Sequence, residues 1–565
     1  MIKEAIYHKS DSTYAYPLDR QTLVLRIRTK RDDIDSVILY YGNRYDPNEI
    51  INIYDVEMTK KYSDELFDYY ETIITPDYNR ICYYFKLIKG EEEIILSQDR
   101  FMKIPPDYRN KYYLFPCICK GDLYKKGDWW KDTILYQIFV DRFYKDGIDK
   151  NWYKIPKSKD VFGGTLEGIV KKLDYLTELG INCIYLTPIF ESDSNHKYDT
   201  VDYYKIDRNF GDEQAFKRFI DECHAKNIKV ILDAVFNHTS DNFFAFKDYV
   251  KNGSDSKYKD WYCIREDGDY ETFADVKKMP KLNTTNPEVI KYFLAVARYW
   301  IEEYGIDGWR LDVANEIDHK FWRLFREEVK RVKEDAIIIG EAWDGGESFA
   351  EGDQFDSVMN YPFLYIADEY FAKDKISTFE FDGLANGYLA KYKGYIANNL
   401  INLLDSHDTS RFLRECGDDI ERLKLAVFFQ MTYPGLPMIF YGDEAGVTGC
   451  NDPDCRRTIN FEKMDFELFK YYKKLIEVRK EYELLRSGDY KTVYVDTDIY
   501  AYSRYDGNSE IVCLFNKGKK NSDIALKIVG KKAIDIFNDK EYDIDSKGLR
   551  VSLKPYGKHI FFIRK

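Results

Sequence analysis

From about residue 131 onward, short apolar runs alternate with segments whose apolar residues recur at helical spacing. The helical segments include residues 164–180, 213–227 and 286–305. The apolar runs number eight: ILYQIFVDRF (134–143), INCIYLTPIF (181–190), KVILDAVFNH (229–238), GIDGWRLDVA (305–314), AIIIGEAW (336–343), SVMNYPF (357–363), NLINLLDSHD (399–408) and LPMIFYGDE (436–444). Near-continuous apolar runs are typical of parallel strands buried on both faces and joined by helical crossovers. Eight of them predict an α/β fold, a (β/α)8 TIM barrel.

A doubly wound open sheet is the alternative fold for such a pattern. It is disfavoured because no glycine-rich dinucleotide loop follows the first apolar run, at 134–143. We therefore expect a closed barrel within a catalytic domain spanning residues 121–488.

The flanking regions have a different sequence pattern: short runs of apolar or alternating apolar and polar residues, separated by polar turns. Residues 1–120 predict an N-terminal β-sandwich, and residues 105–130 resemble a linker. Residues 239–285 form an inserted loop domain after the third barrel strand. Strand patterns return after residue 488 and predict a C-terminal β-sandwich domain over 489–565.

Composition excludes several classes of function. The 565 residues are 44% hydrophobic and 32% charged, with a formal net charge of −13, which argues against a nucleic-acid partner. No run of about 18 apolar residues indicates a membrane span, and the first twenty residues lack the apolar core of a signal peptide. None of the ten cysteines has zinc-site spacing, so we expect no metal centre and a cytoplasmic protein.

Polar side chains gather where the predicted strands end. In a TIM barrel the carboxyl ends of the strands share one face, where the chemistry takes place. Here those ends carry four acids, one arginine, one asparagine and two histidines: Asp233, Asn237, His238, Arg310, Asp312, Glu341, His407 and Asp408. The spacing by two of Arg310 and Asp312 directs both side chains to one face of their strand.

Each of these residues also has a purely structural interpretation. Asp312 alone is compatible with a helix N-cap, and Glu341 alone with a solvated loop. His238 and His407 alone are compatible with satisfied structural histidines, and Asp233 with a simple ion pair. Their coincidence at one end of one barrel favours a catalytic cluster, because buried charges need partners.

Glycoside hydrolysis is the chemistry that needs paired carboxylates and no cofactor. One carboxylate attacks the anomeric carbon, and a second acid protonates the leaving oxygen. A neighbouring guanidinium favours the ionised form of a carboxylate. We therefore expect Arg310 to hold Asp312 anionic and oriented as the attacking group.

The sequence resembles the α-amylase family of glycoside hydrolases, in its neopullulanase, cyclomaltodextrinase and maltogenic amylase branch. The resemblance covers nearly the whole chain. Four core motifs occur in order: DAVFNH (233–238), GWRLDVANE (308–316), GEAW (340–343) and LLDSHDTSR (403–411). Flanking motifs include INCIYLTP (181–188), MPKLN (279–283) and GLPMIFYGDE (435–444).

The resemblance implies a retaining mechanism with Asp312 as nucleophile, Glu341 as acid/base and Asp408 as transition-state stabiliser. It places a second set of residues in sugar binding: Arg310, His238 and His407 at subsite −1, Tyr198 stacking on that sugar, Asn315 and Glu316 on the acceptor side, and the motif residues Asp233, Asn237 and Trp343. Tyr198 by itself is also compatible with packing, since the chain has 50 tyrosines, and Asn315 and Glu316 with the first turn of a helix.

Many relatives carry a calcium site near the end of the first barrel strand. Here Thr165 stands where their aspartate follows a Gly-Gly pair, and calcium prefers several carboxylate oxygens. Only Asp146 and Asp149 remain for a shifted site. We therefore expect no required cofactor.

The N-terminal β domain resembles the starch-binding-like module of this branch, which packs over a partner's active site. The resemblance implies a homodimer with a narrowed cleft that acts on cyclodextrins, maltooligosaccharides and pullulan, with some transglycosylation. Two alternatives stay open: an α-glucosidase or mainly glucosyl-transferring enzyme, and a noncatalytic glycan-binding protein. The second is disfavoured because all three carboxylates are present.

Overall fold

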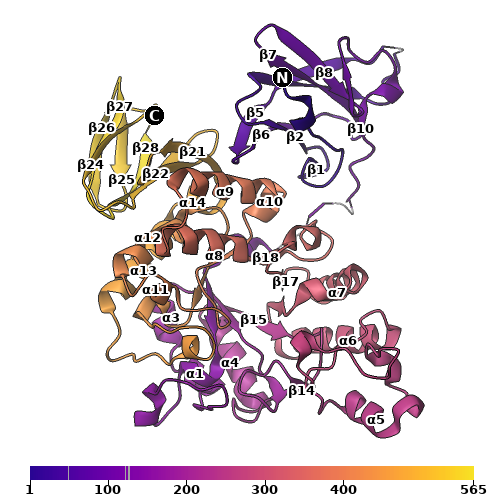
Figure 1. The fold of residues 1–565 in the computed structure, drawn as a ribbon, viewed down its shortest axis with the longest axis vertical. Helices are drawn as coiled ribbons and strands as arrows, with labels where there is room; N and C mark the ends of the chain where they lie inside the picture. Colours follow the sequence, from indigo (N-terminus) through magenta and orange to yellow (C-terminus); the bar gives the residue numbers. More distant parts are fainter. Residues whose placement is uncertain (49, 121–122, 125–126, 565) are drawn as a thin grey trace.

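The computed structural model describes residues 1–48, 50–120, 123–124 and 127–564. Its centre is a closed barrel of eight parallel strands (Figure 1). In order around the barrel these are β11 (Leu135–Ile138), β12 (Cys183–Leu186), β15 (Lys229–Ala234), β16 (Gly308–Leu311), β17 (Ile337–Gly340), β18 (Ser357–Asn360), β19 (Ile401–Leu403) and β20 (Leu436–Phe440). The predicted TIM barrel is confirmed, and the open-sheet alternative is wrong because β20 pairs with β11.

Every barrel strand is shorter than its apolar run, because buried loops and helix starts extend the apolar pattern. The run at 357–363 is only half strand: β18 ends at Asn360, and α8 (Tyr361–Ala367) begins at once. Pro362 lies in the first turn of α8, where its fixed φ and missing N–H are tolerated. The predicted helix over 164–180 is two helices, α2 (Leu166–Val170) and α3 (Leu173–Leu179).

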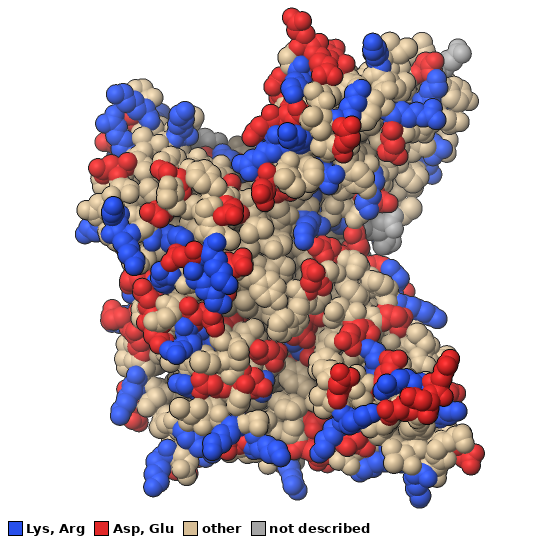
Figure 2. Space-filling model, viewed as in Figure 1, with Lys and Arg blue, Asp and Glu red and all other residues tan. Residues whose placement is uncertain are grey.

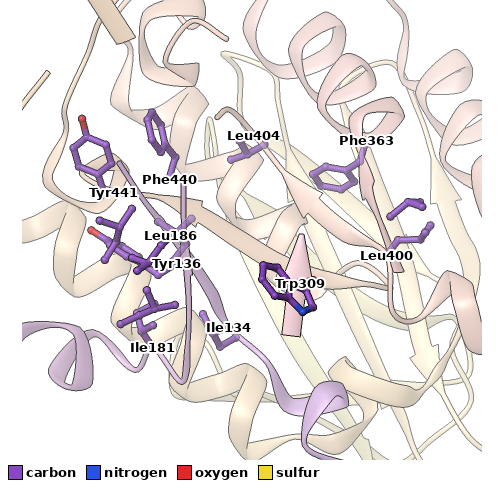
Figure 3. Close-up of a cluster of buried hydrophobic side chains, with 14 of the residues drawn as sticks. Ile134, Tyr136, Ile181, Leu186, Trp309, Phe363, Leu400, Leu404, Phe440 and Tyr441 are labelled. Carbon is purple, nitrogen blue, oxygen red and sulfur yellow. The ribbon is translucent and has the colours of Figure 1, made fainter. Parts of the chain in front are cut away.

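Amphipathic helices surround the barrel and bury their apolar faces against it. Among the longest are α4 (Glu213–Ala225), α6 (Pro287–Tyr304), α7 (His319–Val332), α12 (Ile420–Thr432) and α13 (Phe466–Glu481). Figure 3 shows part of this core, where Trp309 of β16 and Phe363 of α8 are buried with Leu186 and Phe440. Dense packing of this kind holds the strand ends in fixed positions.

The N-terminal domain consists of two antiparallel sheets. One has the order β1 (Ala15–Pro17), β2 (Leu23–Lys30), β6 (Phe67–Ile74), β5 (Thr59–Ser63). The other has β4 (Ile53–Glu57), β3 (Ser36–Asn43), β7 (Ile81–Lys89), β8 (Glu92–Ser97), β9 (Arg100–Met102). The predicted linker is partly wrong, because β10 (Tyr113–Phe115) pairs with β7 and buries two aromatic rings. The predicted boundary at residue 121 lies outside the described residues.

The C-terminal domain is an antiparallel sheet domain of eight strands, β21 (Asp489–Val495) to β28 (Lys558–Arg564). Of these, β22 (Ile499–Tyr505) and β23 (Glu510–Asn516) follow clear apolar runs. The sequence pattern did not reveal four short strands: β24 (Ser522–Leu526), β25 (Lys532–Asp535), β26 (Lys540–Asp545) and β27 (Gly548–Leu553). Both β domains lie on the same side of the barrel (Figure 1), where Lys61 Nζ and Asp489 Oδ1 are 2.6 Å apart.

The insertion between β15 and α6 contains α5 (Phe244–Asn252) and several short 3-10 turns. One isolated bridge, His238 with Lys281, fastens it to the segment after β15, and three more lie within the insertion. It therefore forms one wall above the strand ends. Acidic and basic side chains are interspersed over the face seen in Figure 2. No helix among the described residues is long and apolar enough to cross a membrane.

Candidate active site

One buried guanidinium, that of Arg310, joins three carboxylates from neighbouring strands. Arg310 lies on β16 and is 1% exposed. Its Nη1 lies 2.9 Å from Asp233 on β15 and 2.9 Å from Asp312, which directly follows β16. Its Nη2 lies 2.5 Å from Glu341, the residue after β17. A single cation thus holds together the ends of three adjacent strands.

The charges in this cluster do not balance, because one cation faces three carboxylates. Burial and the nearby Glu341 raise the pKa of Asp312 well above its usual value, although Arg310 opposes the shift. Burial also raises the pKa of Asp233 to about 6, against the lowering effect of Arg310. Arg310 favours the anionic form of Asp312, but its guanidinium is shared with Asp233 and Glu341, so burial and Glu341 still raise the pKa of Asp312.

The backbone after Asp312 has an unusual conformation. Val313 has φ +46° and ψ +43°, the left-handed region that β-branched residues rarely adopt. Such a conformation costs on the order of 1–3 kcal/mol and persists only where neighbours enforce it. Here Glu341 does so: its Oε2 accepts from Val313 N at 3.0 Å, and its carbonyl accepts from Ala314 N at 3.0 Å. The turn therefore fixes Asp312 relative to Glu341.

Asp408, which was predicted as the third catalytic carboxylate, comes from the loop after β19. His407 Nε2 lies 3.1 Å from Asp408 Oδ2 and 2.6 Å from the Tyr198 hydroxyl. Burial lowers the pKa of His407 well below its usual value, with Arg456 adding to the shift, so the imidazole is neutral at neutral pH. Gln137 Nε2 donates to Nδ1 at 2.9 Å, which leaves the ring proton on Nε2, facing Asp408 and Tyr198.

These groups border a cavity of about 520 Å³, a size suited to a small ligand. Seven of the predicted site residues line it: Asp312, Glu341, Asp408, Tyr198, Asn315, Glu316 and Trp343. Asn315 and Glu316 reach it from a 3-10 turn, Ala314–Glu316. The structure thus brings the three predicted carboxylates and the predicted aromatic residues to one cavity.

The other five predicted residues lie behind the cavity wall and are buried: Arg310, Asp233, Asn237, His238 and His407. They reach the cavity through other side chains. His238 Nε2 lies 3.1 Å from the Tyr198 carbonyl, and Asn237 Nδ2 donates to Glu316 Oε2 at 3.2 Å. These contacts orient the residues that line the cavity.

Six further residues line the cavity and were not singled out from the sequence: His196, Phe273, Met279, Val313, Asp452 and Arg456. Arg456 is the most connected: its Nη2 lies 3.4 Å from Asp408 Oδ1 and its Nη1 lies 2.8 Å from Asp452 Oδ1. Five of the six, all but Val313, come from segments outside the strand ends, where no periodic pattern marks them. The signals in the sequence were the motif MPKLN (279–283), which begins with Met279, and the dense charge run NDPDCRR (451–457).

An aromatic pair flanks Glu341 on the open side of the cavity. Trp343 is 42% exposed and stacks on Tyr361, with ring centroids 4.4 Å apart. Trp343 Nε1 and the Tyr361 hydroxyl both donate to Glu341 Oε1, at 3.3 and 3.2 Å. These two neutral donors hold the carboxyl group in place and give the cavity an apolar ledge.

The residues at the relatives' calcium position do not fit a calcium ion. The Thr165 hydroxyl accepts from Gly168 N at 3.0 Å as the cap of α2. Asp146 pairs with Lys171, and Asp149 Oδ1 accepts from Asn151 N at 2.7 Å. No group of three or more His, Cys, Asp or Glu side chains in the described chain is arranged to hold a metal.

Comparison with known proteins agrees with this geometry. The family model for the alpha amylase catalytic domain matches residues 137–271 and 265–466. The chain belongs to the α-amylase family. Models for the alpha amylase N-terminal ig-like domain and the maltogenic amylase C-terminal domain match residues 1–119 and 490–560.

Relatives within the α-amylase family are similar along the whole chain. A cyclomaltodextrinase of Thermoanaerobacter pseudethanolicus is 45% identical over 99% of this chain and 100% of its own. Neopullulanase 2 of Thermoactinomyces vulgaris is 40% identical over 98% of both chains. A solved cyclomaltodextrinase structure superposes with a TM-score of 0.93 at 39% identity, covering 99% of this chain and 100% of that one. The protein is a glycoside hydrolase.

We expect Asp233→Asn to move the acidic limb of the kcat/KM profile toward lower pH, by about one unit. Asp312 must be ionised to attack, so activity is lost as the pH falls through its raised pKa. Asp233 contributes to that raised pKa, and removing its charge lowers it. The measurement is kcat/KM on a maltooligosaccharide as a function of pH.

Asp221→Asn is the matched control, because Asp221 is an exposed carboxylate on the outer helix α4. Its acidic limb should coincide with that of the wild type. An unmoved or upward-shifted limb in Asp233→Asn would contradict the shared-charge interpretation.

Proposed function

We propose that this protein hydrolyses α-1,4 bonds, and some α-1,6 bonds, in cyclodextrins, maltooligosaccharides and pullulan, with retention of configuration and some transglycosylation. One observation carries the proposal: Asp312, Glu341 and Asp408 line one cavity at the ends of barrel strands. The names of relatives at 40–45% identity, cyclomaltodextrinase and neopullulanase, support the substrate class.

In the proposed mechanism Asp312 attacks the anomeric carbon while Glu341 donates a proton to the leaving oxygen. The new bond joins an Asp312 oxygen to the sugar, and the glycosidic bond breaks. In the second half, Glu341 takes a proton from water, which attacks the same carbon and frees Asp312. The contact of both carboxyl groups with one guanidinium supports this pairing, because it keeps them close together.

Asp408 has a third role in the proposal, that of gripping sugar hydroxyls as positive charge develops on the ring. The neutral His407 and the more distant Arg456 leave Asp408 acceptor capacity for a ligand. Tyr198 provides an aromatic face for the bound sugar, since such faces suit the apolar sides of pyranose rings. Its hydroxyl donates to Asp233 Oδ2 at 3.0 Å, which fixes the ring.

The residues on the acceptor side of the cavity determine whether water or a second sugar reacts with the covalent intermediate. Glu316 Oε2 lies 2.6 Å from Lys281 Nζ, and Trp343 offers an exposed ring beside Glu341. A sugar stacked on Trp343 would compete with water for the covalent intermediate. The exposed Trp343 ring therefore supports some transglycosylation. A mainly glucosyl-transferring enzyme is the second candidate function.

We expect wild-type protein to turn over β-cyclodextrin faster than soluble starch, with pullulan also cleaved. Asp312→Asn should lower kcat on every substrate by about 10⁴-fold or more, since it removes the nucleophile. Initial rates of purified protein on the three substrates give the comparison. Asp221→Asn should retain wild-type rates.

A higher initial rate on soluble starch than on β-cyclodextrin would contradict a narrowed cleft. Asp312→Asn with activity near that of the wild type would contradict the assigned nucleophile. Absence of turnover on all three substrates would contradict the proposed function and favour a glycan-binding role.

We further propose a homodimer in which the N-terminal domain contacts the partner. Its surface supports this: of 23 large apolar side chains exposed in the described residues, 11 lie within the first 108 residues. Leu66 and Ile73, on the β5–β6 hairpin, are 61% and 55% exposed.

The intracellular maltogenic amylase of Bacillus subtilis, 39% identical over 93% of this chain, supports a cytoplasmic location.

Light scattering should give the wild type a mass near twice its 67.1 kDa. The double variant Leu66→Asp/Ile73→Asp should elute as a monomer, because buried unpaired charges disfavour an interface. Val529→Asp, at an apolar position in the C-terminal domain that is 89% exposed, serves as control and should remain dimeric. A monomeric wild type would overturn this part of the proposal.

A further inference from the structure

A second pair of acidic side chains, Asp405 and Asp443, lies outside the lining of the cavity, after two adjacent barrel strands. Asp405 follows β19 and is 1% exposed, and Asp443 begins a 3-10 turn, Asp443–Ala445, after the adjacent strand β20. Arg411 lies with them, its Nη1 2.7 Å from Asp443 Oδ1. Asp405 and Arg411 bound the loop that carries His407 and Asp408.

The hydrogen bonds of the two acids are unequal. Asp405 Oδ2 accepts from Phe412 N at 2.6 Å, and Asp443 Oδ2 accepts from Phe440 N at 3.2 Å. The other oxygen, Asp405 Oδ1, is buried and has no N–H or O–H donor among the described residues. The carboxyl groups of Asp405 and Asp443 follow the paired strands β19 and β20 and lie near enough for each to change the pKa of the other.

Two ionised carboxylates do not face each other in this way, because neither has a proton to donate and like charges repel. With both ionised, the buried set of Asp405, Asp443 and Arg411 has a net charge of −1. With one proton shared, the set is neutral, and burial no longer opposes it. Burial and the charge of Asp443 raise the pKa of Asp405 well above its usual value.

We propose that Asp405 keeps a proton in the folded protein, donates it to the ionised Asp443, and thereby acts as a positioning residue for Asp408. Asp443 is the ionised member because it is the one paired with Arg411. The inference rests on the proposed function, since it deepens the role of Asp408. Neither acid contacts the cavity.

The pair fixes the loop from both sides. Asp405 ties the loop to the start of α11 (Phe412–Glu415) through Phe412 N, and to the loop after β20 through Asp443. Opposite, Arg456 Nε donates to the His407 carbonyl at 2.8 Å. A shift at Asp405, three residues before Asp408, therefore moves the carboxylate that grips the sugar.

The test compares two isosteric changes on the same full-length protein. Asp405→Asn keeps a donor toward Asp443 and an acceptor for Phe412 N, so kcat should stay within about threefold of the wild type. Asp443→Asn leaves Arg411 without its carboxylate, and the single acceptor oxygen of the amide cannot serve Arg411, Phe440 N and Asp405 together. It should lower kcat by about 10- to 100-fold with a smaller change in KM, as expected when Asp408 is misplaced.

Melting temperature as a function of pH tests the proton itself and needs no substrate. A carboxyl group whose folded pKa is raised costs no stability below the unfolded value of about 3.8. That cost grows as the pH rises toward the folded pKa, because the folded state must then keep a proton that the unfolded state releases. Asp405→Asn has no such proton, so its melting temperature relative to the wild type should rise between pH 4 and pH 8.

A pH-independent difference in melting temperature, or Asp405→Asn as damaging to kcat as Asp443→Asn, would overturn the proposal. If Asp443→Asn fails to fold, the pH series on Asp405→Asn still decides. A wild type that cleaves no α-glucan, together with the rising pH series, would overturn the proposed function and the link to Asp408 but leave the protonated pair standing.

Discussion

The site depends on one buried cation, the guanidinium of Arg310, shared by carboxylates from three adjacent strands. Removing charges from water costs several kcal/mol per ion unless close partners compensate. Arg310 compensates Asp233, Asp312 and Glu341 together, so none of them has a full countercharge. Burial and the nearby charge of Glu341 raise the pKa of Asp312, and the shared guanidinium only partly opposes that shift.

The barrel holds Arg310 and its three carboxylates together. Parallel pairing sets Asp233 beside Arg310 in register, and the packed helices prevent the strand ends from relaxing apart. The backbone of Val313 has a strained left-handed conformation, and two hydrogen bonds to Glu341 stabilise it. This conformation fixes Asp312 relative to Glu341. Neutral donors such as His407 then complete the surroundings of Asp408 without adding charge.

The sequence predicts the barrel and the three carboxylates because both follow from local pattern: apolar runs end, and polar residues follow. It misses Arg456 and Phe273, which reach the cavity from loops whose paths depend on tertiary packing. It overestimates strand lengths, as at Tyr361, because a buried helix start is as apolar as a strand. It does not show that Arg310 is shared among three acids, because that sharing becomes visible only in three dimensions.

The most direct test of the account is to identify the carboxylate that becomes esterified to sugar. Glu341→Gln protein should be mixed with α-maltosyl fluoride, whose leaving group needs no acid, so that the covalent intermediate accumulates. Proteolysis and mass spectrometry then locate the sugar. The account predicts a maltosyl ester on Asp312 alone. An ester on Asp233 or Asp408, or release of fluoride with no ester on Asp312, would contradict it.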